Sequence, residues 1–504
     1  MIQEEVACPG CYTERPMTEQ RAHKWLILVA VGSALLMGTI DGSIVNVALP
    51  SLTTDLHTQF YLVQWAVLSF LMGLAILTLT AGRLGDMVGK KRVFTVGLIV
   101  FVLASVLCGL SPGIYWLIAF RFLQAVGAAM IVALGVAIVT ETWPRTEHGT
   151  AIGISAGIIS LGAAAGPALG GFILHALSWR WIFFVNVPIG LLSLTLVRIY
   201  VPDLNPTNRN EKFDLMGALF IGLTMLAFVL AMTFTQTRGL FSTPVICLLI
   251  FFAASLIAFV WIEKHAANPM LDLSLFRNSG FSLNLLTGFT TFVCIAGILL
   301  IFPFYLQLVK RMDQQHIGLL MSVVPLSLVV LGPISGTLAD RVGSRPVSLI
   351  GLASILGSYI LISRLTVFTT PTNFILLTLP NGLGMATFLS PNNTAIMSAA
   401  PRHRLGVANG MLSMSRILGQ LTGVSLMGAF FARRLQFYEG KAVDVTTAGS
   451  SAIVRALRDQ SHLAAGLVAV GMFFALWQAQ REWKRRSARS ADEIEETPGT
   501  GSMN

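Results

Sequence analysis

Asp41 is an acidic residue deep inside a long apolar run, in the segment IDGSIVNVALP (residues 40–50). An ionised carboxylate in hydrocarbon is costly, so we expect it to face a polar cavity or to be paired. An acid in such a place can take up and release a proton near neutral pH. We therefore expect Asp41 to exchange a proton for a cationic molecule. The alternative is a structural role, through a helix-packing hydrogen bond to Asn46 or to neighbouring backbone.

Arg121 is a basic residue inside another apolar run. A guanidinium there needs acceptors for its donors, and Asp41 is the charged partner that we expect. The alternative is a structural role in which Arg121 donates to backbone carbonyls near the end of its own helix. Further polar side chains within apolar runs either line a cavity or bond helices together, and the sequence leaves both readings open: Asn46, Asn381, Asn409 and Arg416.

The composition indicates an integral membrane protein. Of the 504 residues, 54% are hydrophobic and only 12% are charged, whereas soluble domains carry roughly 25% charged residues. The apolar surplus must face lipid. The net charge of +10 does not indicate a nucleic-acid partner, because the basic residues stand in short connections between apolar runs, where they set topology.

Apolar runs long enough to cross a bilayer need about 20 residues. We count fourteen, starting near Trp25, Phe60, Val93, Ile114, Ile152, Trp181, Leu215, Thr243, Phe281, Ile317, Val347, Asn373, Val407 and His462. An even number places both termini on the same side. Most of the 34 Lys and Arg stand on that side, so we expect both termini in the cytoplasm and a multi-pass protein of the inner (plasma) membrane.

The chain contains a duplicated unit. GRLGDMVGKKR (residues 82–92) recurs as GTLADRVGSRP (residues 336–346), and glycines of later runs recur in the same register. The matched loops follow the second and the tenth run, so two spans are inserted between two bundles of six. The predicted division is into tails 1–24 and 481–504, six-helix bundles 25–201 and 279–480, and a connector 202–278 that holds the inserted pair.

The first copy of the repeated loop combines glycines with charges. Glycine allows a tight reversal, and Asp86 comes shortly before the third run, where a carboxylate favours a helix N-terminus. Arg83 and Arg92 can pair with it, so we expect a cytoplasmic latch; the alternative is a topological role alone. The latch set comprises Gly82, Arg83, Asp86, Gly89 and Arg92, with a weaker second copy at Asp340 and Arg341.

The fifth run has a face of small residues followed by a proline: Gly162, Gly166, Pro167, Gly170 and Gly171. Small residues let two helices approach closely, and proline removes one backbone hydrogen bond and favours a kink. We expect close packing that seals the first bundle against proton leak. Ordinary helix packing is the alternative.

Together these motifs resemble the major facilitator superfamily, and in particular its fourteen-helix drug:H⁺ antiporter family, over nearly the whole chain. GRLGDMVGKKR resembles the loop between helices two and three, and Arg121 with Gln124 and Gly127 resembles the fourth-helix motif, which implies a proton relay. The glycines with Pro167 match the antiporter pattern of the fifth helix, and IDGSIVNVALP and WRWIFFVNVPIG (residues 179–190) resemble the fourteen-helix branch. The resemblance implies a monomer.

The expected function is proton-coupled antiport that exports hydrophobic or cationic small molecules. A dedicated exporter of a metabolite, siderophore or lipid is the alternative, and a membrane receptor or scaffold is a more distant one. We do not expect an enzyme, because the sequence has no nucleophile motif, and the lone pair Cys8 and Cys11 lacks the second ligand pair of a zinc site. No P-loop is present, so the energy source is expected to be a proton gradient, with no cofactor or metal.

Overall fold

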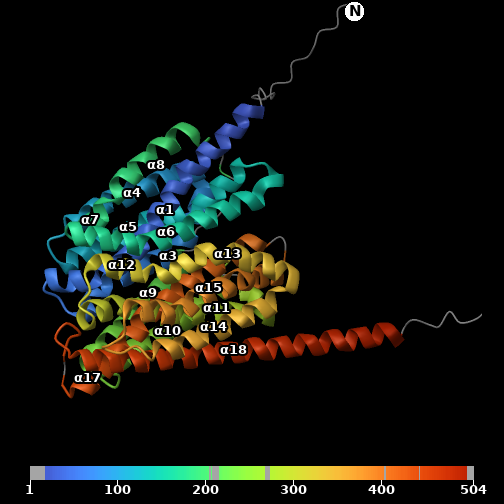
Figure 1. The fold of residues 1–504 in the computed structure, drawn as a ribbon. Coiled ribbons are helices and arrows are strands. Elements are labelled where there is room, and N and C mark those ends of the chain that lie inside the picture. The colour runs from blue at the N-terminus through green and yellow to red at the C-terminus, as the bar shows by residue number, and fades with distance from the viewer. Residues whose placement is uncertain are drawn as a thin grey trace, which may run out of the picture.

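The computed structural model describes residues 17–203, 206, 215–266, 273–401, 404–441 and 443–495, and these are helical with short connections. Cys8 and Cys11 lie outside the described residues, as do most of the predicted N-terminal tail, the last nine residues of the C-terminal tail and parts of the connector. Both described ends of the chain leave the molecule on the same side (Figure 1). We call this side the tail end and the opposite side the far end.

The N-terminal half is built from α1–α8. Its helices are α1 (Met17–Asp55), α2 (Phe60–Val63), α3 (Trp65–Val88), α4 (Lys90–Gly109), α5 (Ile114–Thr142), α6 (His148–Ala176), α7 (Trp181–Phe184) and α8 (Asn186–Tyr200), with a 3-10 turn at Arg145–Glu147. The short helices α2 and α7 each continue directly into the next helix, so each pair forms a single span.

The C-terminal half follows the inserted helices α9 (Leu215–Arg238) and α10 (Thr243–His265) and a 3-10 turn at Leu273–Arg277. It comprises α11 (Ser279–Phe304), which a π-helical turn extends through Tyr305–Val309, α12 (Gln314–Met321), α13 (Val323–Val342), α14 (Ser344–Ile362) and α15 (Pro371–Ala399). It continues with α16 (Leu405–Thr422), a π-helical turn (Gly423–Met427), α17 (Gly428–Glu439) and α18 (Ser450–Glu495).

Thirteen of the described helical segments are long and apolar enough to cross a membrane, and they correspond to thirteen of the fourteen predicted spans. The other predicted span, from Val407, is the continuous helical segment of α16, the π-helical turn and α17. Its hydropathy is low because polar side chains recur along α16 at one-turn spacing. The all-helical fold and the number of long helices therefore agree with the sequence.

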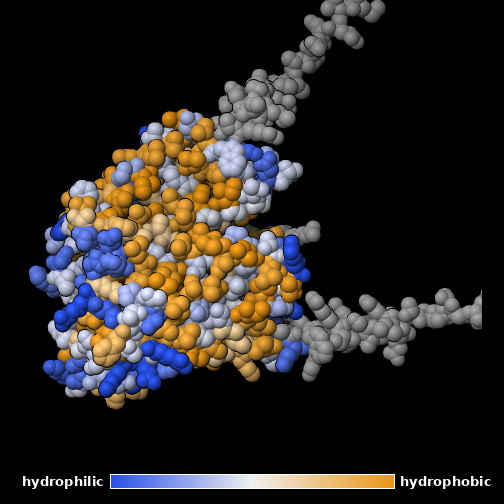
Figure 2. Space-filling model, in the orientation of Figure 1, coloured by the Kyte–Doolittle hydropathy of each residue, from blue (hydrophilic) through white to orange (hydrophobic). Residues whose placement is uncertain are grey.

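The two halves lie one above the other in Figure 1, with α1–α8 in the upper part and α11–α18 in the lower part. Hydrophobic side chains cover the middle of the visible face of both halves, and hydrophilic side chains gather at the far end (Figure 2). An apolar band flanked by polar ends is the surface that a bilayer requires.

The inserted pair covers one seam between the halves. Ile221 and Met225 of α9 pack with Ala75 of α3 and Met414 of α16 in one buried apolar cluster. Towards the far end, Gln236 of α9 donates a hydrogen bond to Gln64, 3.1 Å away, and its backbone carbonyl accepts one from Gln436 of α17 at 2.9 Å. Helix α9 therefore touches both halves along its length.

The buried apolar side chains show where the halves meet. One cluster joins them, with Ile44 and Leu52 of α1 beside Ile301 and Phe304 of α11. A second cluster, which includes Ile27 of α1, draws only on the N-terminal half, and a third, which contains the tail-end residues of α11, draws only on the C-terminal half. The outline in Figure 2 is indented between the halves on the tail side. The halves thus share a core towards the far end and have separate cores at the tail end.

Candidate functional site

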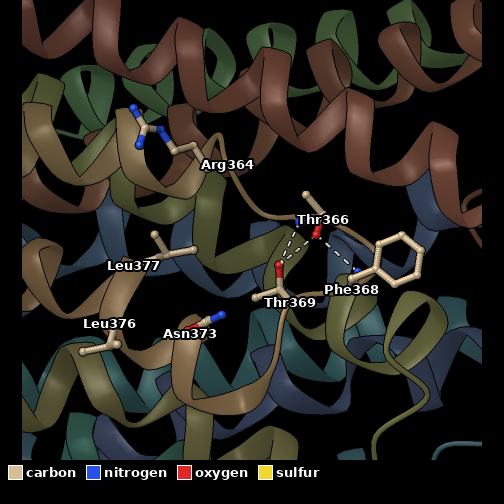
Figure 3. Close-up of a pocket in the computed structure, with 7 residues that line it drawn as sticks. All are labelled: Arg364, Thr366, Phe368, Thr369, Asn373, Leu376 and Leu377. Carbon is tan, nitrogen blue, oxygen red and sulfur yellow. Dashed lines mark hydrogen bonds between the residues drawn. The ribbon is translucent and has the colours of Figure 1, made fainter.

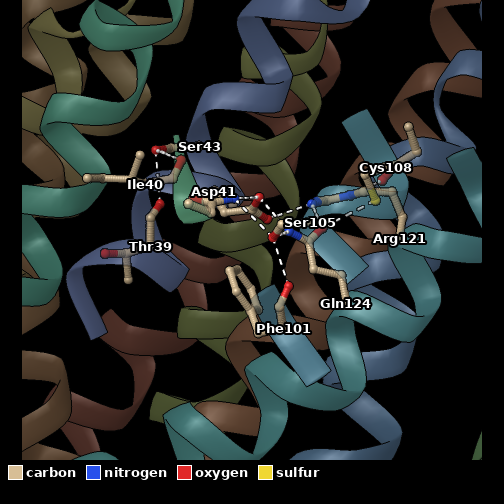
Figure 4. A network of polar contacts seen from close by, with 12 residues as sticks. Thr39, Ile40, Asp41, Ser43, Phe101, Ser105, Cys108, Arg121 and Gln124 are labelled. Atoms are coloured by element: carbon tan, nitrogen blue, oxygen red, sulfur yellow. Dashed lines mark hydrogen bonds and ion pairs between the residues drawn. The ribbon is translucent and has the colours of Figure 1, made fainter. Parts of the chain in front are cut away.

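Asp41 lies at the centre of a buried polar network in the N-terminal half (Figure 4). Its Oδ2 accepts a hydrogen bond from Nη1 of Arg121 at 2.5 Å. Its Oδ1 accepts hydrogen bonds from Nε2 of Gln124 at 2.9 Å and Nδ2 of Asn186 at 2.7 Å. Ser105 accepts from Gln124 at 2.8 Å, so the network joins α1, α4, α5 and α8.

Arg121 makes three hydrogen bonds within the same network. Besides Asp41 it donates to the side chain of Gln124 at 2.6 Å and to the backbone carbonyl of Ala66 at 3.0 Å. Its guanidinium carbon lies 4.1 Å from the ring centroid of Phe70. The pair is neutral overall, with side chains 0% and 1% exposed, so a proton taken up by Asp41 leaves a buried arginine without its counter-charge.

Of the two environments expected for Asp41, a polar cavity or a charged partner, the structure shows the second. The carboxylate does not face a cavity, because it is sealed between helices in this conformation. The hydrogen bond between Asp41 and Asn46, which was the structural alternative, is not found. Asn46 instead donates to the backbone carbonyl of Gly42 at 3.5 Å. Asp41 is therefore a paired acid inside one half of the molecule.

Sequence reasoning missed Asn186 and Ser105. Asn186 stands in the segment 179–190, whose resemblance was noted without assigning a role to this residue. The available signal was an amide in an otherwise apolar run, which in a membrane needs a partner. Ser105 gave no comparable signal, since serine hydroxyls in helices usually bond to the backbone of their own helix.

Replacing Asn186 by Leu is expected to weaken the network without breaking it. The variant removes one donor to the charged form of Asp41, a hydrogen bond worth roughly 1.5–3 kcal/mol. This bond also ties α8 to α1, so the melting temperature of the purified protein should fall. Thermal unfolding of the purified variant tests this, with Asn284→Leu in α11 as the control. An unchanged melting temperature would contradict the assigned contact.

The second half contains a related link without an acid. Asn381 donates to Ser358 at 3.0 Å between α15 and α14. Asn381 is only 3% exposed, so it bonds helices together and does not line a cavity. Of the other polar candidates, Asn409 is exposed, and Asn46 and Arg416 are half-buried.

The repeated loops turn at glycine but make other ion pairs than expected. Gly89 and Gly343 adopt φ values of 114° and 98°, which only glycine adopts readily. Asp86 lies in the last turn of α3, not at the start of the third span, and pairs with Lys90 at 3.3 Å rather than with Arg83 or Arg92. Lys90 also pairs with Glu141 of α5.

Three members of the proposed latch, Arg92, Asp340 and Arg341, make no ion pair of this kind in the described part of the chain. All three are exposed. Gly82 has open space where a Cβ would stand. In this conformation the ion pairs found at the expected latch are those that Lys90 makes with Asp86 and Glu141.

The small residues of α6 serve two different contacts. Gly162 and Gly166 lie against Thr39 and Ser43 of α1, where a Cβ would come within 2.0 and 1.9 Å of the hydroxyl oxygens, and Gly170 lies against Ile44. These contacts flank Asp41 on α1. Pro167 stands inside α6 without ending it.

Gly171 instead meets the other half. A Cβ on Gly171 would lie 2.8 Å from the Cα of Gly318 in α12, and a Cβ on Gly318 would lie 2.4 Å from the carbonyl oxygen of Pro167. The α6 and α12 backbones therefore touch at the far end, an approach that only glycine permits at these positions.

Polar contacts reinforce this closure. Gln314 of α12 donates to Ser51 of α1 at 3.1 Å, and the backbone N–H of Phe60 donates to Asp444 at 2.8 Å. Asp313 lies 3.8 Å from His175 of α6 and contacts His316 more closely. The hydrogen bond from His316 lowers the pKa of Asp313 below its usual value. The two halves are thus closed against each other at the far end.

A depression on the far end of the C-terminal half is a poor candidate for a cargo site. Arg364, Thr366, Phe368, Thr369 and Asn373 line it with two leucines (Figure 3). The N–H of Thr366 donates to Thr369 at 2.9 Å and that of Phe368 to Thr366 at 3.2 Å, so the loop satisfies its own polar groups.

The fold and the buried network define a polytopic membrane transporter with two pseudo-equivalent halves. Residues 31–424 match the Major Facilitator Superfamily model, and the chain belongs to this family. A bacterial homolog of the human lysosomal transporter Spinster, solved inward-facing and unoccupied, superposes with a TM-score of 0.66 at 16% identity over 91% of this chain and 97% of that one.

Relatives whose names state a cargo or a resistance are more similar to this chain in sequence than the Spinster homolog is. The riboflavin transporter RibZ of Clostridioides difficile is 31% identical over 82% of this chain and 90% of that protein. The multidrug resistance protein Stp of Mycobacterium tuberculosis is 34% identical over 81% and 76%. The tetracenomycin C resistance and export protein of Streptomyces glaucescens is 29% identical over 85% and 79%. The chain is thus a transporter of this family and not an enzyme.

Proposed function

We propose that this protein exports hydrophobic and amphipathic small molecules in exchange for protons, by alternating access. The observation that carries the proposal is the ion pair between Asp41 and Arg121, buried in a membrane-spanning bundle. The names of Stp and of the tetracenomycin exporter agree with export. We also propose that both termini lie in the cytoplasm, as the distribution of Lys and Arg predicts, and with this orientation the present conformation is inward-facing.

The coupling proposed here runs from Asp41 to the far end through α6. Protonation of Asp41 removes the counter-charge of Arg121, and the pair that ties α1 to α5 is lost. Helix α6 packs on the same stretch of α1 through Gly162 and Gly166 and ends at the contact of Gly171 with Gly318. A shift of α1 is therefore passed to the far-end closure by direct packing.

The expectation of a cationic cargo loses its main argument. It assumed that Asp41 is open to the cavity, but three donors already occupy this carboxylate. Neutral apolar molecules remain compatible with the site, and the charge that the cargo can carry depends on other residues.

Substrate-dependent proton movement tests the proposed function. The purified chain in liposomes with an internal pH dye should move protons when lipophilic cations, neutral drugs or organic anions are added. A driving force is available, because each charge that crosses is worth about 2.3 kcal/mol per 100 mV. Transport that ignores an imposed pH gradient would refute proton coupling.

A dedicated metabolite exporter is the second candidate, and the likeness to RibZ favours it specifically. The two candidate functions differ in the range of molecules that the protein would transport. Proton movement with riboflavin alone would support the dedicated exporter, and movement with several unrelated drugs would support the broader function.

We also propose that Lys90 works with the latch set Arg83, Asp86 and Arg92 and with its second copy at Asp340 and Arg341. Lys90→Ala should lower the maximal exchange rate about two- to fivefold and leave cargo affinity unchanged, because partly exposed ion pairs contribute roughly 0.2–1 kcal/mol each. Lys91→Ala is the control, since Lys91 pairs with the largely exposed Asp203. A loss of affinity without a loss of rate would count against a latch.

A further inference from the structure

Helix α16 presents one polar side whose contact with another helix is a hydrogen bond from Arg416 to Asn393 of α15. Gly410 and Met414 face α3 and α9, and Gly419 with Ser415 faces α11. At 3.6 residues per turn, the third side carries Asn409, Ser413, Arg416 and Gln420. Asn409 is exposed and the other three are half-buried, so this side is reached from the tail end, where the two halves have separate cores.

Arg416 is the charged residue of this side, and its charge is not neutralised. The structure gives its guanidinium one hydrogen bond, from Nη2 to Oδ1 of Asn393 at 2.7 Å. Its Nε is buried without a hydrogen-bond partner, and in the described residues no carboxylate pairs with it. The guanidinium carbon lies 5.8 Å from the ring centroid of Phe292, within the range of a cation–π contact.

The two arginines within the membrane spans therefore differ in kind. Arg121 has the carboxylate of Asp41 as its partner and makes two further hydrogen bonds. Arg416 keeps donors that nothing in the described chain accepts. A cation within a membrane span is costly unless it is paired or solvated. A guanidinium can donate two parallel hydrogen bonds to the two oxygens of one carboxylate.

We propose that Arg416, with Asn393 beside it, is the subsite that binds an anionic group of the cargo. This rests on the proposed transport function and narrows its substrate class to amphipathic aromatic molecules that carry a carboxylate or a similar anion. The guanidinium takes the anion in a forked pair of hydrogen bonds, and Phe292 offers a ring against which the aromatic part packs. A chloride ion satisfies the same donors, so the test separates an organic from an inorganic anion.

The test compares two probes that differ only in charge. Dansylglycine carries a carboxylate, and dansylglycinamide is its neutral amide. Fluorescence binding to the full-length protein in nanodiscs should show the carboxylate bound about tenfold more tightly than the amide, since hydrogen bonds to charged groups contribute roughly one to two powers of ten. Arg416→Gln should abolish this preference, and Arg416→Lys should keep part of it. Arg364→Gln removes an exposed arginine of the same half and should change nothing.

The outcomes separate the subsite from other roles of Arg416. Equal affinity of the wild type for both probes, or no detectable binding of the carboxylate, overturns the proposal. An equal loss of affinity for both probes in Arg416→Gln also overturns it, because that result indicates a positioning role. A preference for the carboxylate probe that persists as the chloride concentration is raised supports an organic anion, whereas a preference that disappears when chloride is raised overturns the assignment to cargo. Asp41→Asn should leave the charge preference intact even where it stops proton coupling.

Discussion

Asp41→Asn is expected to lower proton-driven transport at least a hundredfold. The asparagine has nearly the same shape as the aspartate, but it cannot exchange a proton at physiological pH, so the step that couples transport to the gradient is lost. Removing one partner of a buried ion pair also leaves Arg121 uncompensated, which costs about 3–5 kcal/mol. The measurement is pH-gradient-driven dye transport in proteoliposomes, together with thermal unfolding of the purified variant.

A second variant separates coupling from folding. In Asp41→Asn combined with Arg121→Gln, no charge remains in the network, so the melting temperature should return most of the way to the wild-type value while transport stays absent. Asp55→Asn, at the exposed end of the same helix, should behave as the wild type. Undiminished pH-gradient-driven dye transport by the Asp41→Asn variant would refute the role of Asp41.

Gly318→Val is expected to prevent closure of the far end. Even the Cβ of the new side chain would lie 2.4 Å from the carbonyl oxygen of Pro167 and 2.8 Å from the Cα of Gly171. Both neighbours are backbone atoms, so they cannot rotate away, and overpacking of this kind typically costs 1–3 kcal/mol. The equilibrium should move towards the conformation that is open at the far end, by about tenfold or more.

Spin labels at His175 and His316, which are exposed on α6 and α12, report this opening as a longer distance between them. Gly332→Val in α13 is the matched control, because its Cβ would meet nothing within 4 Å. An unchanged distance distribution in Gly318→Val would show that this contact does not determine which state is populated.

The sequence predicted the number of long helices because membrane spans follow from length and hydropathy alone. The sequence did not show that the helix starting at Leu405 is less hydrophobic than the other spans. Its polar residues looked unrelated, and only the orientation of the helix in the structure shows that they share one side. The pairing of Asp41 with Arg121 was also predictable, because two opposite charges in apolar surroundings have few other partners.

The contacts of Asn186 and the sealing of Asp41 were not predictable. They depend on how far each helix is rotated about its axis and on which of two conformations is populated, and neither quantity is encoded in residue type or spacing. The same applies to Gly171 and Gly318. Each looks like an ordinary small residue in its own span, and only the crossing of α6 with α12 gives the two a joint role.

The position of α9 makes the two sides of the transporter unequal towards lipid. It covers the contact of α3 with α16, whereas α6 and α13 contact each other and carry the exposed side chains Leu161 and Ile334. With the proposed orientation, we therefore expect an apolar molecule dissolved in the cytoplasmic leaflet to enter between α6 and α13 rather than between α3 and α16.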